Sequence, residues 1–167
     1  MLEFFEHSNL LNEIWEQINQ NIFKKKLDHL SAIGWHHNAE NDDHGHFGIY
    51  SHTTNAMSFS SRFYTLEEKL QECKNIGADL KLNRDDKVEK LSAYAPYLDI
   101  AYGLVAHEMA HQAVCQFSAP SYEHGTEFIK WANVIARESD LPAATEENAA
   151  FWPPQIILLI DELGLRA

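Results

Sequence analysis

Apolar residues recur with the three- and four-residue spacing of an α-helix in several stretches of the chain. The first stretch covers residues 8–27, and Ser8 or Asn9 has the right chemistry to cap it. The second covers residues 97–117 and stays apolar almost throughout. Both patterns predict helices that turn one face toward a hydrophobic core.

The ends of the later helices are also predicted by pattern. In the helix over residues 97–117, Leu98 and Cys115 fall on the face expected in the core. Thr126 is expected to cap another helix, and a short apolar helix is expected after Pro154. Two tryptophans are also assigned to the core, namely Trp35 and Trp131.

Three short stretches between the first two helices have the composition of β-strands. Residues 31–37 and 46–52 flank a polar, turn-rich segment, "NAENDDHG", which predicts a β-hairpin. Residues 55–63 predict a third strand, because apolar residues alternate there with serines.

These elements combine into a single α+β domain over residues 1–167, with a small three-stranded antiparallel sheet packed on helices. The length of 167 residues and the hydrophobic content of 45% fit one compact domain. Residues 65–96 are strongly charged, and their pattern predicts helices broken near Gly77 and around Asn83.

The charge of the chain limits its partners. The formal net charge is −12, and Lys24, Lys25 and Lys26 form the one dense basic cluster of the sequence. We interpret this cluster as the solvated end of the first helix, where the helix dipole favours cations. The charge therefore argues against a broad phosphate-binding surface.

The sequence also bears on location. No apolar run approaches the roughly 20 residues needed to cross a bilayer. The first residues are acidic where a signal peptide would carry positive charge. Cys73 and Cys115 belong to no C-x-x-C pair and suggest no disulfide framework. We therefore expect a cytoplasmic protein without membrane association.

The stretch "AHEMAHQAV", residues 106–114, contains the pattern H-E-x-x-H. On a helix, His107 and His111 lie one above the other, so their two imidazoles can bind one ion. Glu108 can then reach a water on that ion without binding the ion. Zinc lowers the pKa of such a water toward about 7, and a carboxylate can accept its proton. The pattern by itself also fits three ordinary polar residues on a helix.

A catalytic zinc site needs a third protein ligand and an open position. The continuation typical of metzincins, H-x-x-G-x-x-H, is absent, because Val114 and Phe117 occupy two of its positions. His124 in "YEHGTEF" is the favoured third ligand, since the turn before it can bring the chain back to the metal. Glu127 and Glu138 are the alternatives.

"HEMAH" followed by "HGTEF" resembles the metal site of the SprT-like zinc metallopeptidases, the family that includes the Spartan-type proteases. The similarity extends upstream. "INQNIFKKKL" (18–27) is similar to an Asn–Phe–Leu pattern of that family, while "AIGWHH" and "AMSFSSRF" are similar to two of its strands.

The resemblance implies a zincin-like α+β fold with the H-E-x-x-H helix lying across the sheet. It also implies His107, His111 and His124 as ligands of Zn²⁺, with Glu108 as the catalytic base. The function predicted is that of a zinc metalloprotease, which hydrolyses peptide bonds of a protein or peptide with a zinc-bound water activated by Glu108.

The chain departs from the family in two ways. Residues 65–96 look like a helical insertion before the active-site helix, and the cysteine-rich zinc ribbon that follows the catalytic domain in many members is missing. Better-known members act on DNA-associated proteins, so the resemblance makes an association with DNA possible. The acidic charge of this chain does not support it.

The alternative function is a non-catalytic metal-binding or interaction module of the same fold. Structural zinc sites usually close the fourth position with a protein ligand, and Cys115 lies four residues after His111 on the same helix face. Glu108 would then have no role. A zinc hydrolase of a non-peptide amide is a further alternative.

Other polar residues have candidate roles beside ordinary structural ones. Tyr102 and Tyr122 are candidates for stabilising an oxyanion, and Glu123 and Glu127 for orienting His124. A histidine-rich region is interpreted as a solvated turn rather than as a second metal site; its members are His36, His37, His44, His46 and His52, with Asp42 and Asp43.

Overall fold

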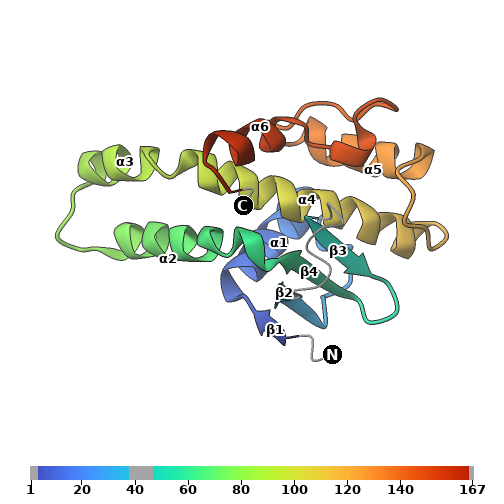
Figure 1. Ribbon diagram of the computed structural model, residues 1–167, viewed down its shortest axis with the longest axis horizontal. Coiled ribbons are helices and arrows are strands. Elements are labelled where there is room, and N and C mark those ends of the chain that lie inside the picture. The colour runs from blue at the N-terminus through green and yellow to red at the C-terminus, as the bar shows by residue number, and fades with distance from the viewer. Residues whose placement is uncertain (1–3, 38–46, 166–167) are drawn as a thin grey trace.

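The computed structural model describes residues 4–37 and 47–165, and over these ranges the fold is α+β, as predicted. Figure 1 shows α4 crossing the middle of the molecule, with the sheet on one side and α5 and α6 on the other. The helices are α1 (Asn9–Asn21), α2 (Thr65–Ala78), α3 (Arg84–Ser92), α4 (Ala95–Phe117), α5 (Thr126–Arg137) and α6 (Gln155–Glu162). The strands are β1 (Phe4–His7), β2 (Ala32–His37), β3 (Gly48–Ser51) and β4 (Ala56–Ser60), and two 3₁₀ turns are η2 (Ser61–Phe63) and η3 (Ala149–Phe151).

The sheet differs from the predicted one in strand number and in pairing. Within the described residues it has four strands in the order β1-β2-β4-β3, and it is mixed, because β2 and β4 run parallel while the outer pairs are antiparallel. The prediction of three antiparallel strands is therefore wrong. The strand it missed, β1, lies in the acidic N-terminal stretch.

The predicted hairpin between residues 31–37 and 46–52 is also wrong. β2 and β3 do not pair, because β4 lies between them and forms a hairpin with β3 instead. The turn-rich segment on which the prediction depended, residues 38–45, lies outside the described residues. Burial explains the central place of β4, since Met57 and Phe59 are both buried, whereas Ile49 of β3 is 49% exposed.

Gly34 of β2 marks a close approach between strands. A Cβ at this position would lie 2.0 Å from the carbonyl oxygen of Glu6 and 2.9 Å from the Cα of His7. Both atoms belong to the backbone of β1, so they cannot move aside as a side chain would. A side chain at position 34 is therefore incompatible with the β1–β2 pairing.

Of the two caps predicted for α1 and α5, the one at Ser8 is confirmed and the one at Thr126 is wrong. The side chain of Ser8 accepts a hydrogen bond of 3.0 Å from the backbone N–H of Leu11 at the start of α1. Asn83 caps α3 in the same way, as the break around this residue suggested. At α5 the cap residue is Gly125, and Thr126 is already the first helical residue.

α1 ends at Asn21 rather than near Leu27. Lys24 and Lys25 take positive φ angles of 53° and 64°, so the chain turns sharply where the prediction continued the helix. The side-chain amide of Asn19 exchanges two hydrogen bonds of 3.1 Å with the backbone of Leu27. These two hydrogen bonds hold Leu27 in place after the turn, where its side chain is buried.

α4 forms the centre of the core and is fixed to α1 by a buried amide. Trp15 donates a hydrogen bond of 2.8 Å from Nε1 to Oε1 of Gln112, whose Nε2 donates to the backbone oxygen of Asp28, also at 2.8 Å. The core assignments for the ends of this helix hold only in part, because Leu98 is 38% exposed and Cys115 is half-buried. No helix in residues 4–37 and 47–165 combines the length and the apolar character required to cross a membrane.

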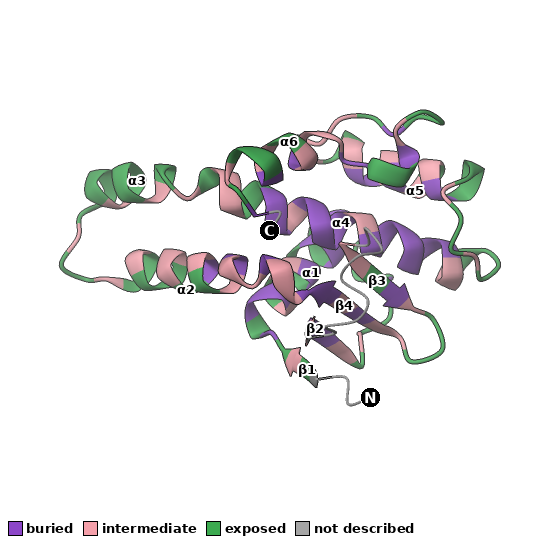
Figure 2. Ribbon diagram, viewed as in Figure 1, coloured by how far each residue is buried: buried purple, intermediate pink, exposed green. Residues whose placement is uncertain are grey.

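The charged segment forms the two predicted helices, α2 and α3. We define its outer part, residues 71–92, as the helical arm, which Figure 1 shows extending away from the sheet. None of its residues is buried, and Figure 2 shows α3 largely exposed. Leu80, at the tip between the two helices, is 98% exposed.

Candidate functional site

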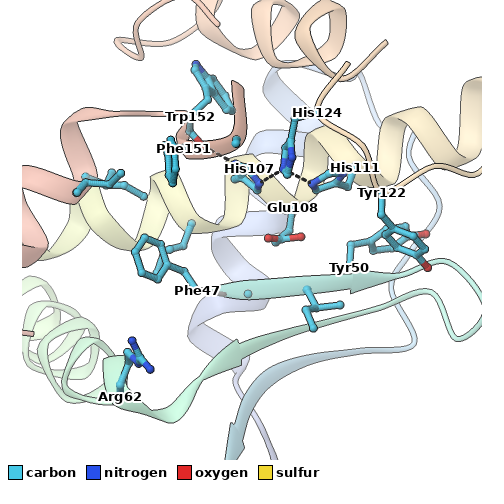
Figure 3. Close-up of a pocket in the computed structure, with 16 residues that line it drawn as sticks. Phe47, Tyr50, Arg62, His107, Glu108, His111, Tyr122, His124, Phe151 and Trp152 are labelled. Atoms are coloured by element: carbon cyan, nitrogen blue, oxygen red, sulfur yellow. Dashed lines mark hydrogen bonds between the residues drawn. The ribbon is translucent and has the colours of Figure 1, made fainter. Parts of the chain in front are cut away.

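Three histidines from two segments converge beside the middle of α4. His107 and His111 are one helical turn apart on this helix, and His124 lies in the loop that leads into α5 (Figure 3). The Nε2 atom of His124 is 3.2 Å from Nε2 of His107 and 3.1 Å from Nε2 of His111. The fold therefore brings together the three residues predicted as ligands.

The donor set and its spacing fit a tetrahedral metal ion. Zinc–nitrogen bonds of 2.0–2.1 Å in a tetrahedron imply ligand nitrogens about 3.3 Å apart, close to the two spacings here. One candidate ligand atom from each histidine lies within 4.8 Å of the other two. Among the described residues no further cysteine, aspartate, glutamate or histidine joins this group, so three protein ligands would leave a fourth position open.

A hydrogen bond fixes the tautomer of His107. Its Nδ1 lies 2.5 Å from the backbone oxygen of Trp152, which can only accept, so Nδ1 carries the proton. Nε2 then keeps its lone pair and faces the other two histidines. Metal-binding histidines are commonly oriented in this way by a partner behind the ring.

The ring of His111 is held differently. Its Nδ1 is buried and has no hydrogen-bond partner within the described residues. Packing has to orient this imidazole instead, and Phe128 of α5 supplies the surface. The Phe128 ring is 1% exposed, and its centroid lies 4.6 Å from that of His111.

Phe128 contacts all three imidazoles. Its centroid is 5.0 Å from that of His107 and 4.8 Å from that of His124. It comes three residues after Gly125, the residue that caps α5, so the start of this helix fixes both the third ligand and the ring behind the site.

Burial keeps the helix histidines neutral. It lowers the pKa of His107 from its ordinary 6.5 to about 4; the Trp152 carbonyl opposes this shift and His124 adds to it. Burial likewise lowers the pKa of His111 to about 3, with His107 and His124 adding to the effect. Both imidazoles are therefore uncharged at neutral pH, the form in which histidine binds metals.

Glu108 lies next to the histidines but points toward β3 (Figure 3). Its side chain is buried, and this burial raises the pKa of its carboxyl from 4.5 to about 8. The backbone N–H of Tyr50 donates a hydrogen bond to it and opposes the shift. The carboxyl group is therefore held between the metal-binding side of α4 and the sheet, with its pKa close to neutral.

A cleft of about 940 Å³ opens beside these residues. β3 forms one wall, and η3 with the start of α6 forms the opposite wall. Its size is in the range of sites that bind small ligands or part of a peptide. Apart from Glu108 and the three histidines, most of the lining is apolar, with Phe47, Ile49, Leu104, Phe151, Ile156 and Ile157 as its main apolar side chains.

The alternative metal ligands do not reach the histidines. Cys115 turns its sulfur toward the backbone oxygen of Ser121 at 3.9 Å and is not part of the ligand group. Glu127 is exposed and lies 3.9 Å from the amine of Lys130. Glu138 is exposed as well and is also outside the group.

The two tyrosines predicted near the metal have different positions. Tyr122 lines the cleft and is 50% exposed, but its hydroxyl lies 2.5 Å from Nδ1 of His52 in the turn between β3 and β4. Figure 3 shows its ring beside that of Tyr50. Tyr102 does not line the cleft. Glu123, the candidate for orienting His124, is exposed.

The histidine-rich region is only partly within the described residues. His36 places Nδ1 2.5 Å from the hydroxyl of Ser58, and His52 contacts Tyr122. The other members of the predicted turn, His44 and His46 with Asp42 and Asp43, lie outside the described residues.

Several residues that shape the site were not predicted. Trp152 binds His107 through its carbonyl from 45 positions further along the chain, and no sequence pattern links the two. Tyr50 acts through its backbone N–H, which its side chain does not encode. Phe128 lies in the helix that was predicted to begin at Thr126, but its contact with the histidines depends on how α5 returns to α4.

No protein-family model matches the chain, and comparison with curated proteins and with solved structures gives no match either. The case for a function therefore depends on the geometry of the three histidines, Glu108 and the cleft.

Proposed function

We propose that the chain is a zinc-dependent peptidase with the chemistry implied by its resemblance to the SprT-like metallopeptidases. One observation supports this most strongly: three histidine Nε2 atoms converge beside a buried glutamate, at the edge of an open cleft. A purely structural metal site has no need of an open cleft or of a carboxyl group with a pKa near neutral.

The residues suited to hold zinc are His107, His111 and His124. When bound, zinc supplies a Lewis acid that polarises a carbonyl and lowers the pKa of a water in the fourth position. Trp152 and Phe128 orient the imidazoles for this task, the first by its hydrogen bond to His107 and the second by contact with all three rings.

Glu108 acts as the general base and then as the general acid. Its carboxylate takes a proton from the attacking water, whose oxygen forms a bond to the scissile carbonyl carbon. The same group then passes the proton to the leaving amine as the carbon–nitrogen bond breaks. Burial raises the pKa of this carboxyl to about 8 in the metal-free protein, and a cation bound by the histidines would lower it again, so that the carboxylate is available at neutral pH.

β3 offers an edge along which an extended substrate can pair. It is the last strand of the sheet, and the backbone oxygen of Phe47 accepts a hydrogen bond from Ser60 beside β4. Because pairing alternates along an antiparallel strand, Gly48 and Tyr50 direct their backbone groups away from β4 and toward the cleft, where the N–H of Tyr50 already donates to Glu108. A peptide added there would lie beside Glu108.

The alternative, a non-catalytic metal module closed by Cys115, has less support. The sulfur of Cys115 points to Ser121, and Glu108 would be a buried carboxyl group without a function. Burying such a group lowers the stability of the folded protein, so a catalytic role explains its presence better than a structural one.

The test is zinc content and cleavage of an unfolded protein by the wild type, Glu108→Gln and Cys115→Ala, with and without a chelator. We expect wild type and Cys115→Ala to cleave and to lose activity with the chelator, while Glu108→Gln keeps zinc and is inactive. Equal cleavage by Glu108→Gln would refute the mechanism. Bound zinc without cleavage, lost in Cys115→Ala, would support the structural module. Repeating the assay with added DNA tests whether nucleic acid changes activity despite the net charge of −12.

A further inference from the structure

Arg62 places a cation in the same cleft as Glu108. It belongs to η2, the short turn that follows β4, and it lines the cleft at the end where β3 begins. Figure 3 shows Phe47 between Arg62 and Glu108. Among the described residues that line the cleft, Arg62 is the one lysine or arginine.

An apolar stretch separates Arg62 from the histidines. Leu104 lies on α4 one turn before His107, a rise of about 5 Å along the helix. Phe47, just before β3, and Ile156 and Ile157 of α6 also line the cleft. The cleft thus runs from the histidines through an apolar section to a guanidinium group.

This order of groups selects for a particular ligand chemistry. The apolar section favours a large hydrophobic side chain, because burying it removes apolar surface from water. A guanidinium group binds carboxylates through paired N–H donors, and its five donors can serve more than one acceptor at once. The positive charge of Arg62 is not part of a generally basic chain, because the net charge of the whole chain is −12.

We propose that the cleft selects peptides that carry a large apolar side chain next to the scissile bond and a carboxylate further along, which Arg62 binds. This inference rests on the proposed function and names its substrate class. The carboxylate belongs either to an aspartate or glutamate side chain or to the free C-terminus of the peptide. Arg62 is a specificity residue here and does not touch the reacting atoms.

Three matched peptides distinguish these sources. Each has the same apolar residue after the scissile bond; one ends in a free carboxylate, one is amidated, and one is amidated but carries an internal glutamate. We expect wild type to prefer at least one carboxylate peptide over the plain amidated one by about tenfold or more in kcat/KM, mainly through KM.

Variants at position 62 assign this preference. Arg62→Gln is expected to lower the ratio of kcat/KM between the carboxylate and the amidated peptides to about one, and Arg62→Lys to keep part of the preference, because a single ammonium lacks the paired donors. Arg84→Gln is the matched control, since it removes the same charge from exposed α3. If Arg62→Gln leaves the ratio of kcat/KM between the carboxylate and the amidated peptides unchanged, the assignment is wrong. An equal fall of this ratio in Arg84→Gln would also overturn it.

Binding to zinc-loaded Glu108→Gln, measured by calorimetry, separates this inference from the proposed function. A carboxylate preference that disappears in the Glu108→Gln/Arg62→Gln double variant supports the inference even if wild type cleaves no peptide, in which case the peptidase proposal fails. Cleavage of all three peptides at equal rates refutes the inference and leaves the peptidase proposal standing. Failure of all three peptides to bind overturns the inference.

Discussion

The site around α4 and the helical arm differ in how deeply their residues are buried and in how their polar side chains are paired. From Ile100 to Val114, α4 is buried at nearly every position, and its polar side chains there have specific partners or converge on one point. The helical arm has no buried residue. Its contacts are exposed hydrogen bonds, such as that from Lys87 to the backbone oxygen of Gly77 at 2.8 Å.

This contrast distinguishes the residues that orient the candidate site from the exposed residues of the arm, which have no role in it. Buried polar groups in the site are costly unless they are paired, so each one has to be explained by a partner or a function. Exposed ion pairs of the arm contribute at most about 1 kcal/mol each. Substitutions should therefore have large effects in the site and small effects in the arm.

Phe128→Ala should have the largest effect on folding. Removing a ring that is 1% exposed leaves a cavity beneath the histidines, and such losses cost about 3–5 kcal/mol. Zinc affinity should fall as well, because the ring contacts all three imidazoles. Chemical denaturation and zinc titration measure both effects. Val88→Ala in the arm is the control, and a change beyond about 0.5 kcal/mol there would contradict the contrast.

Glu108→Gln should stabilise the metal-free protein at neutral to alkaline pH. The carboxyl has a pKa of about 8 when folded and an ordinary value of 4.5, so its contribution to stability is full below about pH 4.5 and is lost as the pH rises toward 8. Glutamine removes this loss, and a shift from 4.5 to about 8 corresponds to a gain of about 4 kcal/mol at pH 8.

The gain from Glu108→Gln should vanish near pH 4.5, where wild type and variant both carry a neutral group. His107 and His111 add an opposite dependence, since their lowered pKa values reduce stability as the pH falls below 6.5. They affect both proteins alike, so the difference between the two curves isolates Glu108. A pH-independent difference would show that Glu108 is not held as described.

Asn83→Ala should have the smallest of the three effects and should stay within the arm. Loss of this cap, whose side chain accepts from the backbone N–H of Asp86 at 2.8 Å, costs about 1 kcal/mol. Hydrogen exchange should increase in α3 while zinc affinity stays unchanged. A weakened metal site in this variant would mean that the arm and the site are coupled.

The sequence predicted the local parts of the site better than its assembly. His107 and His111 share a helix, so their geometry follows from spacing, and the turn predicted before His124 indicated that the chain returns to them. The partners behind them come from distant segments. Trp152 and the backbone of Tyr50 meet α4 only through the packing of η3 and β3, which no local pattern encodes.

The same limit explains the errors in the fold. The helices of the charged segment were predicted from composition and from the breaks near Gly77 and Asn83, and Asn83 does cap α3. The sheet required knowledge of which strands pair. β4 separates β2 from β3, and β1 joins the sheet where Gly34 allows a close approach, relations between strands that are remote in sequence.

The zinc content of single histidine and cysteine variants tests the central claim most directly. Wild type and Cys115→Ala should each retain one zinc ion after dialysis. His107→Ala, His111→Ala and His124→Ala should each weaken zinc binding by more than about 100-fold, since even the loss of an outer partner costs about 10–100-fold. Full zinc retention by His124→Ala, or loss of zinc in Cys115→Ala, would contradict a three-histidine site with an open fourth position.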